Sequence, residues 1–256
     1  MIESRGPIFP KVIGSEKDII DLIPALEAAE NLQYVYDAVK LTKIELNNRV
    51  PLIGFAGAPF TIFAYMVEGK GSKTFSKAKQ MIYREPALAH KLLDAITNTT
   101  IAYLKRKVEA GVDLVQIFDS WAGVLSAEDF QLFSLPYMQK IATELKKLVP
   151  VTLFAKDAFH SLVEISKSDC NVVGLGWSSP AAATRKLLGE NIVIQGNLDP
   201  SVLYANHDKI RELTIKMLKD FGKYHVANLG HGVYPDTDLD AVKCFVNTVK
   251  EFRYDN

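Results

Sequence analysis

Residues 86–121 read PALAHKLLDAITNTTIAYLKRKVEAGVDLVQIFDSW and contain the clearest evidence for the fold class. The first part begins at a proline, has apolar residues at helical spacing and ends at Gly111, so it predicts a long helix. The second part, Asp113–Phe118, is a short apolar run followed by the polar residues Asp119 and Ser120, which is typical of a buried strand. A helix that leads into a buried strand predicts a unit of a parallel α/β fold.

The same strand pattern recurs from residue 51 to the end of the chain. Six apolar runs, each followed by glycine, proline or polar residues, are Pro51–Ala56, Asp113–Phe118, Val149–Phe154, Asn171–Leu175, Asn191–Gln195 and Tyr224–Asn228. Between them, Ser126 with the acidic residues after it predicts the start of a helix over 130–148, and Asp199 before Pro200 predicts a helical turn. Residues 15–48 predict one or two helices before the first strand. The sequence therefore predicts six βα units around a parallel sheet.

Length and composition favour one soluble domain with a small-molecule partner. The chain has 256 residues, 48% of them hydrophobic, which suffices for a single domain over residues 1–256. Thirty basic residues balance thirty acidic ones, and the largest basic group is Lys105–Lys107, so we expect no nucleic-acid partner. No apolar run reaches about 18 residues, so we expect no membrane partner either. The two cysteines, Cys170 and Cys244, form no disulfide framework and suit a reducing compartment.

Candidate site residues follow the strands, because ligands of parallel βα arrays bind beyond the carboxyl ends of the strands. His231 lies between two glycines at such an end, where imidazole can donate or relay a proton, or simply be a turn histidine bound to a carbonyl. Ser120 can donate a hydrogen bond to a substrate, or it can cap the next turn together with Asp119. No G-x-S-x-G sequence surrounds Ser120, which disfavours covalent serine catalysis, and no metal-ligand spacing occurs near the strand ends.

Six motifs at these strand ends resemble the uroporphyrinogen decarboxylase family. They are Gly54-Phe-Ala-Gly-Ala-Pro-Phe-Thr61, Tyr65-Met-Val-Glu-Gly69, Phe118-Asp-Ser-Trp-Ala-Gly123, Phe154-Ala-Lys156, Gln195-Gly-Asn-Leu-Asp-Pro200 and Asn228-Leu-Gly-His-Gly232. The resemblance covers nearly the whole chain and keeps the order of the motifs. It is therefore much stronger evidence than any one motif.

The resemblance implies a cytoplasmic, homodimeric (β/α)8-barrel enzyme of the TIM type. Such an enzyme decarboxylates the four acetate side chains of uroporphyrinogen III to give coproporphyrinogen III in haem biosynthesis, without metal or organic cofactor. Tyr65, Ser120 and His231 match the family's substrate-binding tyrosine, serine and histidine, which grip or orient carboxylates. In the family, an aspartate stabilises the protonated pyrrole, and arginines bind the other carboxylates.

The sequence departs from the family in two respects. The aspartate motif, similar to Phe-Ser-Asp-Ile-Leu, and the arginine motif, similar to Arg-Gln-Ala-Gly-Arg, do not occur in it. In the family both precede the region where this chain begins, so we expect an incomplete barrel that lacks the first two strands, an unknown catalytic residue and doubtful activity of the chain alone. Gly176 stands where the family usually has an aspartate before tryptophan, and this predicts a looser loop or a weaker polar contact.

Two alternative functions remain open from the sequence. The chain could be a catalytically inactive relic that binds tetrapyrroles or another protein. It could also resemble the zinc- and corrinoid-dependent methyltransferases of the same superfamily, which hold zinc with histidine and cysteine. The segment His231-Gly-Val-Tyr234 has no cysteine, which disfavours the methyltransferase function.

Overall fold

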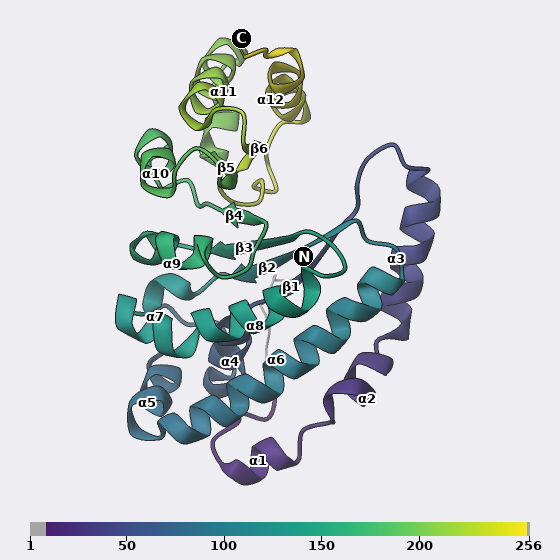
Figure 1. The fold of residues 1–256 in the computed structure, drawn as a ribbon, viewed down its shortest axis with the longest axis vertical. Coiled ribbons are helices and arrows are strands. Elements are labelled where there is room, and N and C mark those ends of the chain that lie inside the picture. The colour runs from purple at the N-terminus through teal and green to yellow at the C-terminus, as the bar shows by residue number, and fades with distance from the viewer. Residues whose placement is uncertain (1–8, 255–256) are drawn as a thin grey trace. The chain divides into compact units, whose positions relative to one another are not determined.

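The computed structural model describes residues 9–254, and the chain divides after Asn171 into two compact units. The first unit covers residues up to 171 and the second begins at residue 172. In both units parallel strands alternate with helices, which confirms the predicted α/β class (Figure 1). The organisation of residues 1–256 as one domain stays a prediction.

The first unit consists of an N-terminal group of helices followed by three strands with helices between them (Figure 1). Its elements are α1 (Glu16–Ile20), α2 (Ala25–Glu30), α3 (Gln33–Leu46), β1 (Ile53–Gly57), α4 (Pro59–Glu68), α5 (Ser76–Arg84), α6 (Pro86–Glu109), β2 (Leu114–Asp119), η1 (Ala122–Val124), α7 (Ala127–Phe133), α8 (Leu135–Leu145), β3 (Val151–Ala155), η2 (Phe159–Ser161) and α9 (Leu162–Ser166). β1 pairs with β2 and β2 pairs with β3, both in parallel. The carboxyl ends of these three strands therefore lie at one edge of the sheet.

The second unit repeats the same alternation. Its elements are β4 (Val172–Gly174), α10 (Ala181–Leu188), β5 (Val193–Leu198), η3 (Pro200–Tyr204), α11 (His207–Phe221), β6 (His225–Leu229) and α12 (Leu239–Glu251). β5 pairs in parallel with β4 on one side and with β6 on the other. All six predicted strands are confirmed, and their ends differ from the predicted ones by one to three residues.

Helix α6 has the apolar face that the sequence predicts. Leu92, Ile96 and Leu104 are buried on this face, and α6 packs against α2, α4, α8 and β1 (Figure 1). Gly111, just after the helix, has a φ of +109°, a conformation that residues with a Cβ rarely adopt. The predicted end of the helix at this glycine is therefore confirmed.

Two helix predictions were wrong in detail. The single helix predicted over 130–148 is divided at Ser134, whose φ of −124° is not helical. Pro136 lies in the first turn of the next helix, where its missing N–H needs no partner. Ser126 does cap the first of the two helices, since its hydroxyl accepts a hydrogen bond from the Asp129 N–H at 3.1 Å. Residues 15–48 contain three helices instead of one or two, because Pro24 separates α1 from α2.

The outer edge of β1 is covered by a lysine. Within residues 9–254, β1 pairs only with β2, and β6 pairs only with β5, so the six strands form no closed barrel. The Lys107 ammonium donates a hydrogen bond of 2.9 Å to the Phe55 carbonyl on β1. The same nitrogen lies 4.4 Å from the centre of the Tyr103 ring, and burial lowers the pKa of Lys107. Its carbon stem and charge thus occupy the unpaired side of the strand.

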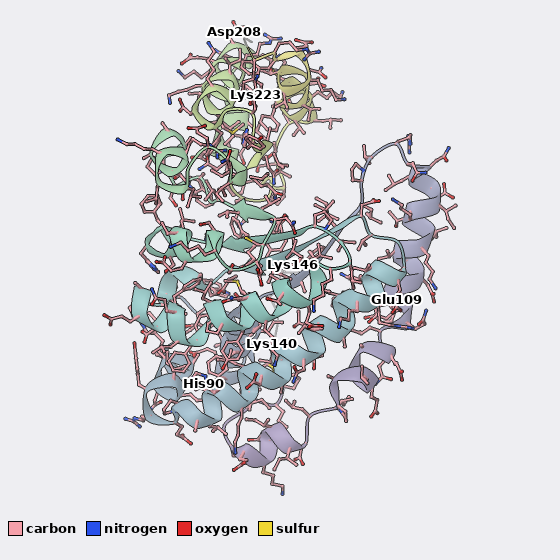
Figure 2. The ribbon with its side chains drawn as sticks, viewed as in Figure 1. His90, Glu109, Lys140, Lys146, Asp208 and Lys223 are labelled. Carbon is pink, nitrogen blue, oxygen red and sulfur yellow. The ribbon has the colours of Figure 1, made fainter. Side chains whose placement is uncertain are left out.

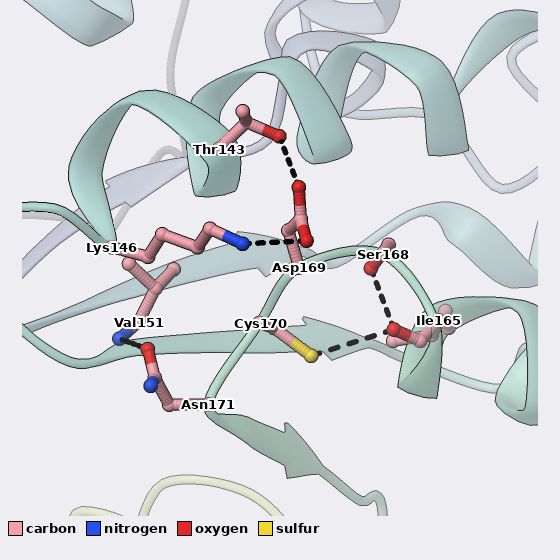
Figure 3. A network of polar contacts seen from close by, with 8 residues as sticks. All are labelled: Thr143, Lys146, Val151, Ile165, Ser168, Asp169, Cys170 and Asn171. Carbon is pink, nitrogen blue, oxygen red and sulfur yellow. Dashed lines mark hydrogen bonds and ion pairs between the residues drawn. The ribbon is translucent and has the colours of Figure 1, made fainter.

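Polar contacts fix α8 and the segment that leads into β4 within the first unit (Figure 3). The Asp169 carboxylate accepts hydrogen bonds from Thr143 at 2.8 Å and from Lys146 at 2.6 Å, and these two donors lower its pKa. The Asn171 side chain accepts a hydrogen bond of 2.8 Å from the Val151 amide. Earlier on α8, Lys140, which is labelled in Figure 2, forms an ion pair of 3.3 Å with Asp94 of α6.

Candidate functional site

A buried carboxyl group organises the strand ends of the first unit. Asp119, the last residue of β2, is 0% exposed and accepts hydrogen bonds from the hydroxyls of Thr61 at 2.6 Å and Ser134 at 2.5 Å. Burial raises the pKa of Asp119, although the two hydroxyl donors oppose this shift. Asp119 therefore ties α4 and α7–α8 to the end of β2.

Ser120 is exposed next to this buried carboxyl group. The residue after it, Trp121, donates its backbone N–H to the Thr61 hydroxyl at 3.2 Å, so the same network fixes the backbone on both sides of Ser120. The side-chain hydroxyl is placed at the carboxyl end of the strand, where the sequence predicts a substrate contact.

Tyr65 approaches the same segment from α4. It is half-buried, and its ring contacts the Trp121 ring edge-to-face at 6.3 Å and the Phe75 ring at 5.7 Å. The ring centres of Phe75 and Trp121 in turn lie 4.6 Å apart. The aromatic contacts hold the body of the tyrosine ring, and they bring Tyr65 and Ser120 to neighbouring positions around Trp121.

The loops after β2 and β3 meet at a glycine. A Cβ atom at Gly123 would lie 2.6 Å from the Cβ of Asp157 and 3.2 Å from the Lys156 carbonyl oxygen, so only glycine fits between them. Lys156, from the Phe154-Ala-Lys156 motif, lies 3.8 Å from the Asp157 carboxylate and adds a cation to this part of the strand ends. Two of the strand-end motifs are thus in contact.

His231 belongs to the second unit and is exposed at the end of β6. Its ring contacts the Trp177 ring edge-to-face, with ring centres 5.7 Å apart and an angle of 89° between the planes. The distance from its Nδ1 to the Gly232 carbonyl oxygen is 3.4 Å, which is long for a hydrogen bond. The aromatic contact, more than a carbonyl partner, defines the surroundings of this imidazole.

Three of the other four histidines have partners that explain them structurally. His90, labelled on α6 in Figure 2, lies 2.6 Å from the Tyr137 hydroxyl and stacks on Phe133. His160 lies 2.7 Å from the Ser161 hydroxyl. His225 contacts the Gly196 carbonyl oxygen through Nε2. A carbonyl can only accept, so this nitrogen carries the proton in the neutral ring.

We expect His225 to make the protein less stable in mild acid. Burial lowers its pKa below the ordinary value of 6.5, so the unfolded chain takes up the proton first as the pH falls. Its contribution to stability is complete above pH 6.5 and decreases as the pH falls towards the folded-state pKa. Urea titrations between pH 7.5 and 5.5 give the free energy of unfolding as a function of pH. In His225→Gln the slope of this free energy against pH should be smaller than in the wild type, by up to about 1.4 kcal/mol per pH unit. An unchanged slope would contradict this explanation.

Gly176 lies in a loop that is hydrogen-bonded to β5, and the predicted effect of this glycine on the loop stays a prediction. It is buried, and its carbonyl oxygen accepts a hydrogen bond of 2.9 Å from the Asn197 side chain. A Cβ at this position would lie 3.9 Å from the Ser178 hydroxyl and 4.0 Å from the Gly230 carbonyl, which are ordinary contacts. The loop is held by Asn197, a residue for which the sequence indicated a strand-end position but no role.

Residues 9–254 contain no group of three or more histidine, cysteine, aspartate or glutamate side chains that could hold a metal ion. Among the helices of the same residues, none is long and apolar enough to cross a membrane.

Comparison with protein families and curated proteins gives one consistent result. The family model described as "Uroporphyrinogen decarboxylase (URO-D)" matches residues 1–252. A uroporphyrinogen decarboxylase from Chlorobaculum parvum is 48% identical over 98% of this chain and 74% of its own length. The uroporphyrinogen decarboxylase from Christiangramia forsetii is also 48% identical, over 97% of this chain and 73% of its own length.

Solved structures share the fold. A methyltransferase from Methanosarcina mazei superposes with a TM-score of 0.75 at 23% identity, covering 85% of this chain and 63% of the other. A B12-independent methionine synthase from Shewanella superposes with a TM-score of 0.59 at 12% identity, covering 84% of this chain and 64% of the other. At these identities the likeness concerns the fold alone. Together with the six alternating βα units, it supports the predicted relation to the TIM-type barrel.

Proposed function

Because the chain belongs to the uroporphyrinogen decarboxylase family, we propose that it acts in the conversion of uroporphyrinogen III to coproporphyrinogen III, by decarboxylation of four acetate side chains. The observation that carries this proposal is the 48% identity to a curated uroporphyrinogen decarboxylase over 98% of the chain. The positions of Tyr65 and Ser120 around Trp121, at the carboxyl ends of parallel strands, are consistent with it.

The reaction requires a proton donor, an anion and carboxylate-binding groups. Protonation of an electron-rich pyrrole carbon gives a cation, which accepts the electron pair of the breaking C–C bond as carbon dioxide leaves. The protein therefore has to orient the acetate groups and stabilise the positive charge of the ring. Neither task requires a metal ion or an organic cofactor.

Tyr65, Ser120 and His231 supply the carboxylate-binding groups in this proposal. The tyrosine and serine hydroxyls and an imidazole N–H can each donate a hydrogen bond to a carboxylate oxygen. Aromatic contacts hold the rings of Tyr65 and His231 before substrate arrives, so less conformational entropy is lost on binding.

Asp119 is not the anion that stabilises the pyrrole cation in this proposal. Asp119 is 0% exposed and already binds two hydroxyls, so it is not accessible to a pyrrole ring. The aspartate and arginine motifs of the family do not occur within the 256 residues. We therefore propose that these residues bind the substrate carboxylates and that turnover requires a segment carrying the aspartate.

The test is an anaerobic assay of carbon dioxide release from uroporphyrinogen III. We expect no release above the buffer blank with the 256-residue chain alone. We expect release when the segment with the aspartate and arginine motifs, taken from the Chlorobaculum parvum relative, is supplied. In that sample, Tyr65→Phe and His231→Asn should each lower kcat/KM by about 10- to 100-fold, because each removes a hydrogen bond to a charged group.

Tyr83→Phe is the matched control. The Tyr83 hydroxyl donates to Asp129 at 2.6 Å, and Tyr83 lies outside the motifs that contain Tyr65 and His231. It should leave kcat/KM unchanged within about twofold. Tetrapyrrole binding without carbon dioxide release, even with the added segment, would instead favour the inactive relic. Release by the chain alone would show that another carboxylate stabilises the pyrrole cation.

The methyltransferase alternative has little support. The solved methyltransferase shares the fold alone, at 23% identity, and the segment His231-Gly-Val-Tyr234 contains no cysteine. We further propose that the protein is cytoplasmic and forms a homodimer, as the resemblance implies. Sedimentation equilibrium at several concentrations tests the dimer, and a monomer at all of them would contradict it.

A further inference from the structure

The surroundings of His231 are built by three consecutive contacts within the second unit. The first is the edge-to-face contact with Trp177, with ring centres 5.7 Å apart and planes at 89°. This arrangement places the positive edge of one ring against the negative face of the other and is a favoured geometry of aromatic pairs. The orientation of the imidazole therefore depends on where the Trp177 ring is held.

The second contact fixes the backbone of Trp177 against the end of β6. A Cβ atom at Gly230 would lie 2.2 Å from the Trp177 backbone nitrogen and 2.7 Å from its Cα, so the backbone segments at these two residues are in direct contact. The Gly230 amide also donates to the Leu198 carbonyl at 2.8 Å, which keeps the end of β6 beside the end of β5. Residue 231 follows directly, so its position relative to the Trp177 loop is closely defined.

The third contact is made by Asn197, at the end of β5. Its side chain is 7% exposed, and its single amide nitrogen donates to the carbonyl oxygens of Gly176 at 2.9 Å and Ser179 at 2.7 Å. These two carbonyls stand on either side of Trp177 in the chain. The Asn197 backbone N–H lies 3.2 Å from the Met217 sulfur of α11, which anchors the residue itself.

We propose that Asn197 is a positioning residue, which holds the 176–179 loop so that the Trp177 ring orients the His231 imidazole for a substrate carboxylate. The carboxylate part rests on the proposed function. The nitrogen of a primary amide carries two N–H donors, so Asn197 can bind both carbonyls from one atom. Asn197→Asp has the same shape, but it turns an acceptor oxygen towards the two carbonyls, which displaces the loop.

Nuclear magnetic resonance of the full chain tests the orientation directly. The ring current of Trp177 shifts the carbon-bound protons of the His231 imidazole, which His231→Asn assigns by their loss. Trp177→Leu gives the positions without the ring current. We expect the signals in Asn197→Asp to move most of the way to those positions. Signals that stay at the wild-type positions in a folded Asn197→Asp protein would overturn the proposal.

A carboxylate titration gives the functional readout without turnover. Acetate, followed through the His231 signals, should bind about fivefold more weakly to Asn197→Asp and Trp177→Leu, because a freely rotating imidazole loses more conformational entropy on binding. Trp177→Phe keeps an edge-to-face partner and should restore the wild-type affinity. Equal acetate affinity in the wild type and the three variants would overturn the positioning role. If the wild type binds no acetate, the proposed carboxylate role of His231 is contradicted. The ring-current experiment then still decides whether Asn197 orients the imidazole.

A matched control separates positioning from general destabilisation. Thr214 is 0% exposed on α11, and its hydroxyl donates to the Ile210 carbonyl at 2.7 Å. Both residues of this hydrogen bond lie on α11, outside the 176–179 loop. Thr214→Val removes this buried hydrogen bond and should leave the His231 signals and the acetate affinity unchanged. If Asn197→Asp does not fold, Asn197→Ala removes the donors without a charge and is read in the same way. Equal shifts in Thr214→Val would overturn the proposal.

Discussion

Arg185→Met is expected to lower the free energy of unfolding by about 4 kcal/mol, because it removes a charged donor that makes four hydrogen bonds to buried and partly buried backbone carbonyl groups. The guanidinium, in a residue that is 5% exposed, donates to four backbone carbonyls. They belong to Phe221 at 2.8 Å, Gly189 at 2.9 Å, Ile192 at 2.7 Å and Tyr224 at 2.8 Å. These acceptors join the end of α10, the approach to β5, the end of α11 and the start of β6.

Urea unfolding at pH 7 measures this effect. Lys186→Met is the matched control, since Lys186 is the exposed neighbour of Arg185 on α10, and it should change the free energy of unfolding by less than about 0.5 kcal/mol. Arg185→Lys should recover only part of the stability, because one ammonium cannot reproduce the planar set of donors. A loss of less than about 1 kcal/mol in Arg185→Met would mean that water satisfies these carbonyls equally well.

Asp119→Ala is expected to lower the free energy of unfolding by about 3 kcal/mol. The alanine leaves a cavity and deprives the buried hydroxyls of Thr61 and Ser134 of their acceptor. Asp119→Asn keeps the shape and one acceptor oxygen, so at pH 7 it should lower the stability by only about 1 kcal/mol. Equal losses in the two variants would show that the charge, and not the acceptor geometry, is what the hydroxyls require.

The pH dependence distinguishes the role of the carboxyl group further. Because burial raises its pKa, folded Asp119 binds a proton more tightly than the unfolded chain does. Its contribution to stability is therefore complete below the ordinary pKa of 3.8 and decreases as the pH rises through the folded-state pKa. Asp119→Asn lacks this dependence, so the difference between wild type and variant should be larger at pH 4 than at pH 7. A difference independent of pH would contradict the raised pKa.

The sequence predicts the strands better than the helix boundaries. Six apolar runs closed by glycine or polar residues are a local signal, and each gave a strand within one to three residues. The division between α7 and α8 is different in kind. It occurs at Ser134, whose hydroxyl binds Asp119 at a distance of 15 residues in sequence, and a local pattern of apolar residues does not contain that contact.

The candidate site shows the same limit. Tyr65, Ser120 and His231 could be proposed because they lie in motifs at strand ends, whereas their surroundings depend on contacts between remote segments. Asn197 and Arg185 act almost entirely on backbone carbonyls, and every residue type has such a carbonyl. No pattern of side chains in the sequence therefore indicates their partners.

Lys107 of α6, which covers the edge of β1, has a consequence for how the protein behaves in concentrated solution. Open edges of β-sheets recruit strands from other molecules and so begin aggregation. A strand that approached β1 would have to displace the Lys107 ammonium from the Phe55 carbonyl and remove its charge from the rings of Phe55 and Tyr103. We therefore expect Lys107 to keep this edge from seeding aggregates, and the yield of monodisperse protein to depend on it.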